Sequence, residues 1–122
     1  MINIGMLKSL DEAKQIIMNN DRVMVKFSAG WCVPCKMIKT VCEGNFNKMT
    51  EDGVVCLNVD IDDEMDFYML LKQKKQVTSI PSLCYYYGDK SEDTWYVPRE
   101  IYAGSKLPEV QGFFDKCGKL RE

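Results

Sequence analysis

Apolar residues follow two patterns along the chain. Short, nearly continuous apolar runs are typical of strands covered on both faces, and apolar residues every three or four positions are typical of helices. The first pattern predicts strands at residues 2–4, 23–27, 54–60 and 83–87, and a last strand that ends at 101–104. The second predicts helices at about 9–18, 33–49, 62–75 and 107–118. This order predicts an α/β domain with a mixed sheet of four or five strands and helices on both faces.

Several helix ends carry recognisable signals. Ser9 and Glu12 are three residues apart, as in a capping box. The helix at 62–75 has acidic residues at its start and lysines at its end, which complements the helix dipole. We therefore interpret that charge run as helix stabilisation and not as a binding patch. In the last helix, Pro108 suits the first turn and Gly118 is expected to be the cap.

The segment between the last two strands predicts an extended hairpin. A polar turn at 88–93 is followed by 94–97, and Pro98 fits an edge strand because it need not donate to a ladder. Trp95 and Tyr96 either cover this hairpin, the interpretation we favour, or form a tip that binds a partner.

Cys32 and Cys35 stand where the apolar strand at 23–27 gives way to a helix. The first turn of a helix has backbone N–H groups without partners, and the helix dipole favours negative charge there. We therefore expect the pKa of Cys32 to lie below the usual value of about 8.5. Pro34 suits this first turn, and Lys36 adds positive charge. Such a dithiol can attack a disulfide, form a mixed disulfide and release it by internal attack.

Half of a zinc site is the alternative interpretation of this pair. Zinc would need further ligands at a suitable spacing, but the sequence has no histidine. The remaining cysteines are widely scattered: Cys42, Cys56, Cys84 and Cys117. The strand–turn–helix setting favours redox chemistry, so we expect no metal. Cys42 is expected in the core, and Cys117 in the core or at its rim.

Composition limits the location and the partners. The chain has 122 residues, enough for a single domain over residues 1–122. Its net charge of −2 argues against nucleic-acid binding. Because we see neither a long apolar span nor a basic, apolar leader, we expect no membrane contact and a cytoplasmic location. That location favours reduced thiols over a disulfide framework of the six cysteines.

The stretch Trp31-Cys32-Val33-Pro34-Cys35-Lys36, preceded by 25–29, closely resembles the active site of the thioredoxin family. The family usually has Gly-Pro where this chain has Val-Pro. The resemblance implies a thioredoxin fold and a thiol–disulfide oxidoreductase that reduces protein disulfides. It also implies that Cys32 attacks and Cys35 resolves the mixed disulfide, with no bound cofactor beyond this redox-active pair. The implied partners are disulfide-containing proteins and a disulfide reductase as electron donor, and we expect a monomer.

Two further segments extend the resemblance over nearly the whole chain. Ile80-Pro81 resembles the family's cis-proline loop, which lies against the active-site disulfide. Gly104, at the end of the last strand, resembles a glycine that lets a substrate approach closely. The resemblance therefore implies a shallow substrate groove shaped by Trp31, Ile80, Pro81 and Gly104.

Two positions depart from the family. Lys26 stands where the family usually has a buried Asp, and Cys56 where it often has a Lys, so we expect the two side chains to be neighbours. Lys26 either extends its ammonium to solvent or lies near the dithiol. In the second case its charge would favour the thiolate and make the pair more oxidising. Cys56 is either an inert core thiol or one activated by Lys26.

Two other functions remain open from the sequence. A disulfide oxidase or isomerase is the first, because Lys26 would raise the reduction potential. The second is a binding module in a larger complex, suggested by the long 88–99 segment and the loss of the acid at position 26. The intact Cys pair argues against this binding module.

Overall fold

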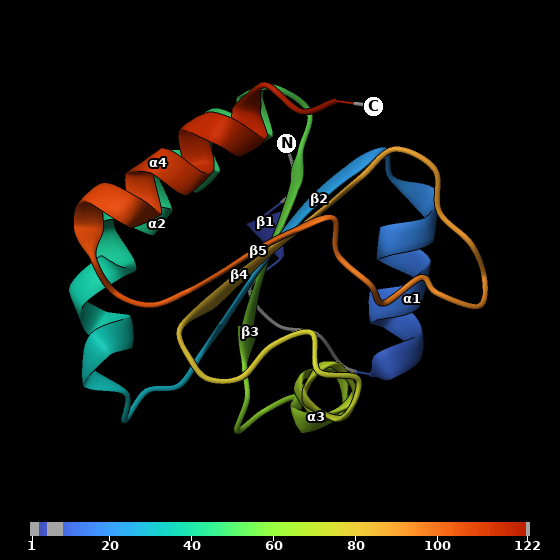
Figure 1. Ribbon diagram of the computed structural model, residues 1–122, viewed down its shortest axis with the longest axis horizontal. Helices are drawn as coiled ribbons and strands as arrows, with labels where there is room; N and C mark the ends of the chain where they lie inside the picture. The colour runs from blue at the N-terminus through green and yellow to red at the C-terminus, as the bar shows by residue number, and fades with distance from the viewer. Residues whose placement is uncertain (1–2, 5–8, 122) are drawn as a thin grey trace.

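Residues 3–4 and 9–121 are described by the computed structural model, and their strands form one five-stranded sheet (Figure 1). The strands are β1 (Asn3–Ile4), β2 (Arg22–Ser28), β3 (Val55–Asp60), β4 (Ser82–Tyr87) and β5 (Glu100–Ala103). The helices are α1 (Leu10–Asn19), α2 (Val33–Glu51), α3 (Met65–Gln73) and α4 (Leu107–Gly118). The predicted α/β architecture is confirmed, and Ile2 of the predicted first strand lies outside the described residues.

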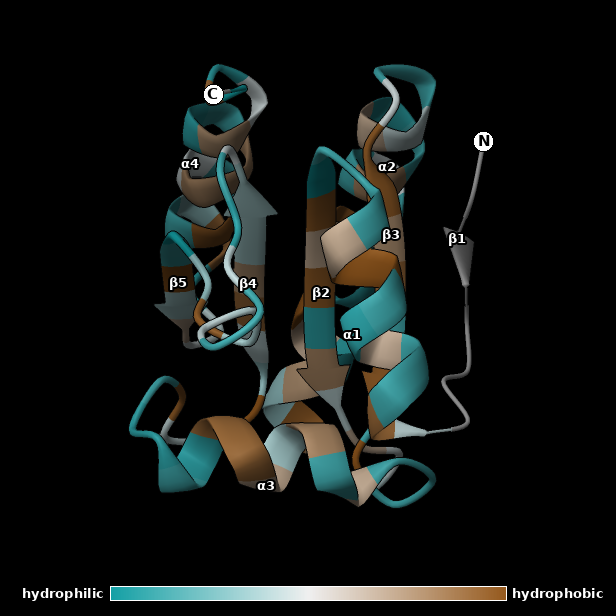
Figure 2. Ribbon diagram, turned by 90° about the vertical axis from the view of Figure 1, so that its right-hand side faces the viewer, coloured by the Kyte–Doolittle hydropathy of each residue, from teal (hydrophilic) through white to brown (hydrophobic). Residues whose placement is uncertain are grey.

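The sheet is mixed, in the order β1-β3-β2-β4-β5. β1, β3 and β2 run parallel, while β4 is antiparallel to β2 and β5 is antiparallel to β4. The central strand β2 pairs with β3 on one side and with β4 on the other. Figure 2 shows hydrophobic colours along much of β2 and β3, as expected of strands covered on both faces.

Helices cover both faces of the sheet (Figure 1). On one face, α2 and α4 pack through residues such as Phe46 and Phe114, whose ring centroids are 6.0 Å apart. On the other face, Ile17 of α1 and Phe67 of α3 join Phe27 of β2 in a second core cluster. None of the helices among the described residues has the length and apolar character needed to cross a membrane.

The helix ends agree with the sequence in part. The Ser9 hydroxyl accepts a 3.1 Å hydrogen bond from the Glu12 N–H, as the capping box predicts. α3 begins at Met65, later than expected, because Glu64 is its N-cap and the Asp62 N–H bonds to Asp60 Oδ1 in the preceding turn. The prediction that Gly118 caps α4 is wrong, since the helix includes it and Lys119 is the cap.

The extended hairpin predicted for residues 88–99 does not form, because β5 begins only at Glu100. Trp95 instead folds into the core, where its ring stacks on Phe67 at 5.9 Å between centroids and only 9% of the residue is exposed. The Lys90 ammonium donates to the Asn20 carbonyl at 2.5 Å and so ties the loop to the end of α1. Burying the indole against α3 removes more apolar surface from water than an isolated two-stranded extension would. Trp95 is therefore a core residue and not a partner-binding tip.

Replacing Trp95 with alanine is expected to lower the free energy of unfolding by about 3 kcal/mol, because it removes a buried aromatic side chain and leaves a cavity. Urea unfolding would measure the loss. Val97→Ala, in the same loop but 38% exposed, is the control and should change stability by less than about 1 kcal/mol. Equal effects of the two substitutions would show that Trp95 does not anchor the loop.

Candidate active site

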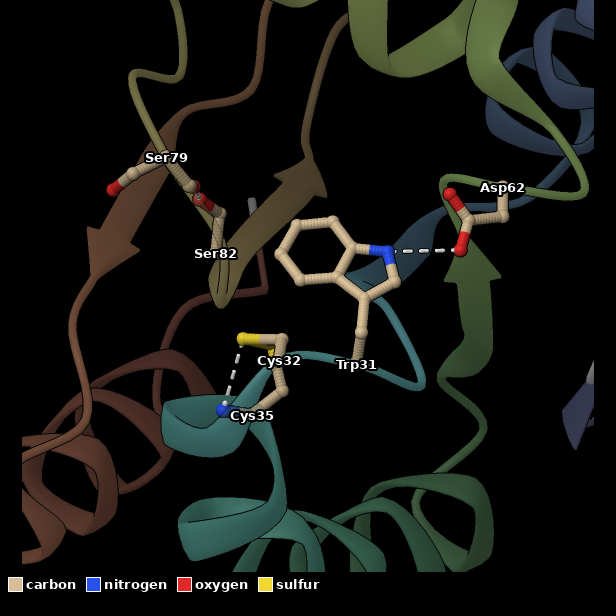
Figure 3. The surroundings of a disulfide bond; sticks show 6 residues. All are labelled: Trp31, Cys32, Cys35, Asp62, Ser79 and Ser82. Atoms are coloured by element: carbon tan, nitrogen blue, oxygen red, sulfur yellow. Dashed lines mark hydrogen bonds between the residues drawn. A yellow bond between two sulfur atoms is a disulfide. The ribbon is translucent and has the colours of Figure 1, made fainter.

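The two cysteines of the predicted redox pair form a disulfide at the start of α2 (Figure 3). Cys32 is the N-cap, and its sulfur accepts a hydrogen bond of 3.2 Å from the Cys35 N–H. Pro34 lies in the first turn, as predicted. Both cysteines are nearly buried, at 5% and 6% exposure. The local sequence produces this placement because β2 ends at Ser28 and a short turn leads into the helix.

The start of α2 favours negative charge at Cys32. The first turn contains no acidic residue, and Lys36 lies there exposed to solvent. The partial positive charge of the helix N-terminus acts in the same direction. A thiolate formed at Cys32 on reduction would therefore meet a backbone N–H donor and a favourable dipole.

The Trp31 indole lies beside the disulfide and is held by Asp62, which follows the neighbouring parallel strand β3 (Figure 3). Its Nε1–H donates a 3.0 Å hydrogen bond to Asp62 Oδ2, while 64% of the residue stays exposed. Sequence reasoning missed Asp62, because the acidic run at 62–64 was assigned to helix stabilisation. A signal for its role was its place just after the apolar strand that lies next to β2.

The other predicted groove residues also come together near the disulfide. The Ile80–Pro81 peptide bond is cis, and Ile80 packs against the core cluster that contains both cysteines of the pair. The Gly104 N–H donates to the Pro81 carbonyl at 3.2 Å, which joins the end of β5 to this loop. Figure 3 shows Ser82 next to the disulfide, and the Ser82 hydroxyl donates to the Ser79 carbonyl in the same loop.

Lys26 lies on the face of β2 that α2 covers and is only 8% exposed. With Cys35, Lys39, Glu43 and other residues it lines a cavity of about 410 Å³. Burial lowers the pKa of Lys26, whereas the nearby Cys42 and Glu43 raise it. Lys26 is thus buried beside a cavity that Cys35 also lines, and its effect on the dithiol stays a prediction.

Cys56 lies diagonally to Lys26 on the same face of the sheet, and not directly opposite it. The register of β2 and β3 pairs Lys26 with Asn58 and pairs Cys56 with Met24. The Cys56 thiol donates to the Phe46 carbonyl at 3.7 Å. Burial raises its pKa to about 12, and the cation that opposes this shift is Arg22. Cys56 is therefore a protonated core thiol.

The remaining free cysteines are also buried. Burial raises the pKa of Cys42 to about 11 and that of Cys117 to about 12, and it raises the pKa of Cys84 as well. Protonated thiols are poor nucleophiles and poor metal ligands. Across residues 3–4 and 9–121, no group of three or more His, Cys, Asp or Glu side chains could hold a metal ion.

Comparison with known proteins agrees with this geometry. The thioredoxin family model matches residues 6–101. The chain belongs to the thioredoxin family. It is 35% identical to thioredoxin-2 of Saccharomyces cerevisiae over 88 residues, which cover 71% of this chain and 79% of the relative. It is 32% identical to thioredoxin 1 of Plasmodium falciparum over 94 residues, covering 75% and 82% of the two chains.

Solved thioredoxin structures share the fold. The thioredoxin of Malassezia sympodialis has a TM-score of 0.70 at 21% identity, covering 95% of this chain and 94% of that one. The Plasmodium falciparum thioredoxin also has a TM-score of 0.70, at 25% identity, covering 93% and 98%. With the Cys32–Cys35 disulfide, family membership makes this thioredoxin-family protein a protein thiol–disulfide oxidoreductase. A reductase role is consistent with its thioredoxin relatives.

The four core thiols of this thioredoxin-family protein are expected to resist alkylation by iodoacetamide at pH 8, because burial hinders access and raises their pKa values. Mass spectrometry of the folded, oxidised protein should detect no label on Cys42, Cys56, Cys84 or Cys117. The same treatment in urea should label all four. Labelling of any of them in the folded protein would contradict their assignment as inert core residues.

Proposed function

We propose that the protein reduces disulfides of protein substrates through Cys32 and Cys35. The Cys32 thiolate attacks a substrate disulfide, a mixed disulfide forms, and one substrate sulfur leaves as a thiolate. Deprotonated Cys35 then attacks the Cys32 sulfur, so that the Cys32–Cys35 bond forms and the second substrate sulfur leaves. The substrate gains two electrons and the pair is oxidised. The observation that carries this proposal is Cys32 at the N-cap of α2, bonded to Cys35 one turn further on.

The residues around the disulfide support a substrate groove. We assign Trp31, Ile80, Pro81 and Gly104 to it, because the first is exposed beside the disulfide and the other three meet at the Pro81–Gly104 hydrogen bond. An extended substrate segment could pair with the backbone at Ile80 as an added strand. Pro34 and Lys36 would modulate the thiolate from the first turn of α2.

We further propose the electron donor for this activity and the compartment in which it occurs. A disulfide reductase would return electrons to the pair, and no bound cofactor, nucleic acid or membrane takes part. Four free thiols in the core suit a reducing compartment, so we assign a cytoplasmic location. Helices cover both faces of the sheet, which suits a monomer that acts as a single domain over residues 1–122.

Cys35→Ser is expected to trap mixed disulfides between Cys32 and protein substrates, because the resolving thiol is missing. Non-reducing gel electrophoresis of captured proteins would detect them, and reduction should release them. The Cys32→Ser/Cys35→Ser double variant is the control and should capture none covalently. Partners retained equally by both variants, and unaffected by reductant, would favour a binding module over an enzyme.

A disulfide oxidase or isomerase is the second candidate function, and Lys26 is the observation that favours it. Its side chain borders the same cavity as Cys35, within the part of the chain that the structure describes. A cation there stabilises the thiolates of the reduced pair relative to the disulfide, so it raises the reduction potential. A higher potential would favour donating disulfides over reducing them.

Lys26→Asp is expected to lower the reduction potential of the pair by roughly 30 mV, since it replaces a cation with an anion at this cavity. Equilibration against glutathione would measure the shift. Lys26→Met, which removes the charge without adding an acid, should lower it less.

Lys39→Asp is the control for this measurement. Lys39 lines the same cavity but is exposed, so solvent screens its charge and the substitution should change the reduction potential less than Lys26→Asp does. A thioredoxin-like potential that does not respond to either Lys26 substitution would remove the case for an oxidase or isomerase.

A further inference from the structure

Tyr102 of β5 lies along α4 and is fixed at both ends of its side chain. Its ring centroid is 6.0 Å from that of Phe113, and its hydroxyl donates a hydrogen bond of 3.0 Å to Glu109 Oε1. Glu109 and Phe113 are four residues apart, so they share one face of α4. Packing therefore holds the ring, and the carboxylate holds the hydroxyl. In Figure 1 the chain runs from β5 directly into α4, so this contact spans the connection between them.

The hydroxyl end of Tyr102 fills the space beside Gly104. A Cβ atom added to Gly104 would lie 2.8 Å from the Tyr102 hydroxyl oxygen and 3.2 Å from Cζ. Gly104 also has a φ of +147°, which side chains disfavour. Tyr102 therefore occupies the space that a side chain at position 104 would need, and it limits how far the glycine backbone can move toward the tyrosine.

Gly104 transmits this constraint to the Ile80–Pro81 loop. Its N–H donates to the Pro81 carbonyl at 3.2 Å, and Pro81 follows Ile80, which packs against the core cluster to which Cys32 and Cys35 also belong. A continuous set of contacts thus joins Glu109 on the surface of α4 to the loop beside the disulfide. Tyr102 is the link between the helix and the glycine.

The Tyr102 hydroxyl keeps its proton near neutral pH. Burial raises the pKa of Tyr102, and the hydrogen bond to Glu109 raises it further, while the Lys106 backbone amide lowers it. The hydroxyl therefore remains a donor to the Glu109 carboxylate over the pH range in which disulfide exchange is normally measured.

We propose that Tyr102, held by Glu109, is a positioning residue that keeps Gly104 and Pro81 in place for protein substrates. The inference rests on the proposed role of Gly104 in the substrate groove. Tyr102 acts through Gly104, so it affects how well an extended polypeptide fits and not the exchange between sulfurs. Losing its hydroxyl raises the KM for a protein disulfide and leaves kcat unchanged. A small disulfide that does not fill the groove is insensitive to the loss.

The test compares two substrates in Tyr102→Phe and Glu109→Ala. Insulin, reduced in the presence of dithiothreitol, is the protein disulfide, and 5,5′-dithiobis(2-nitrobenzoate) is the small one. Each variant is expected to raise the KM for insulin roughly five-fold, the factor that loss of one hydrogen bond produces, with kcat and the rate with the small disulfide unchanged. The double variant should show no larger effect than Tyr102→Phe alone, because that substitution already removes the bond to Glu109.

Glu109→Gln is the matched control, because its amide oxygen can still accept the hydrogen bond, and it should restore the KM of the wild type. Glu109 is exposed, so its substitutions test the inference without disturbing the core. Thermal unfolding of each variant checks that the fold is intact.

The outcomes separate this inference from the groove assignment. If Gly104→Ala raises the KM for insulin but Tyr102→Phe and Glu109→Ala do not, the inference is wrong and the groove stands. If Gly104→Ala and Trp31→Ala also have no effect, the groove assignment itself fails. An equal loss of activity with both substrates in Tyr102→Phe would show a general structural role and would likewise overturn the inference.

Discussion

The pairing of β2 with strands on both of its edges is the constraint on which the site depends. Backbone ladders to β3 and β4 extend to the end of β2 at Ser28 and Phe27. That end of the strand cannot shift without breaking hydrogen bonds on two sides, so the short turn that follows begins from a fixed point. Cys32 is consequently placed at the N-cap of α2, where the N–H groups and the dipole of the helix act on its sulfur.

Burial divides the six cysteines into two chemical groups. Four lie in the core, where the loss of solvation disfavours the thiolate and raises their pKa values. Cys32 and Cys35 are nearly as buried, but they lie at a helix start that stabilises negative charge. The position of the sulfur relative to the helix, and not its exposure alone, therefore separates the redox pair from the inert thiols.

The surroundings of the disulfide come from segments far apart in the chain, and each is held by a contact to another element. Asp62, after β3, accepts the hydrogen bond from the Trp31 indole. The Gly104 N–H bonds to the Pro81 carbonyl, and Tyr102 packs between Gly104 and α4. These contacts hold the segments around the disulfide in place. Lys26 lines the same cavity as Cys35, and burial lowers its pKa.

The sequence by itself determined the order of the helices and strands and the location of the redox pair, because apolar spacing, caps and the start of α2 are local properties. Ser9 and Glu12 form the expected cap, and Cys32 and Cys35 form the expected disulfide. Tertiary structure decided the partners of side chains from distant segments. The register of β2 and β3 placed Asn58 beside Lys26, and α3 offered Phe67 to Trp95. Strand register and helix packing set such contacts, and both depend on the whole core, which no local pattern encodes.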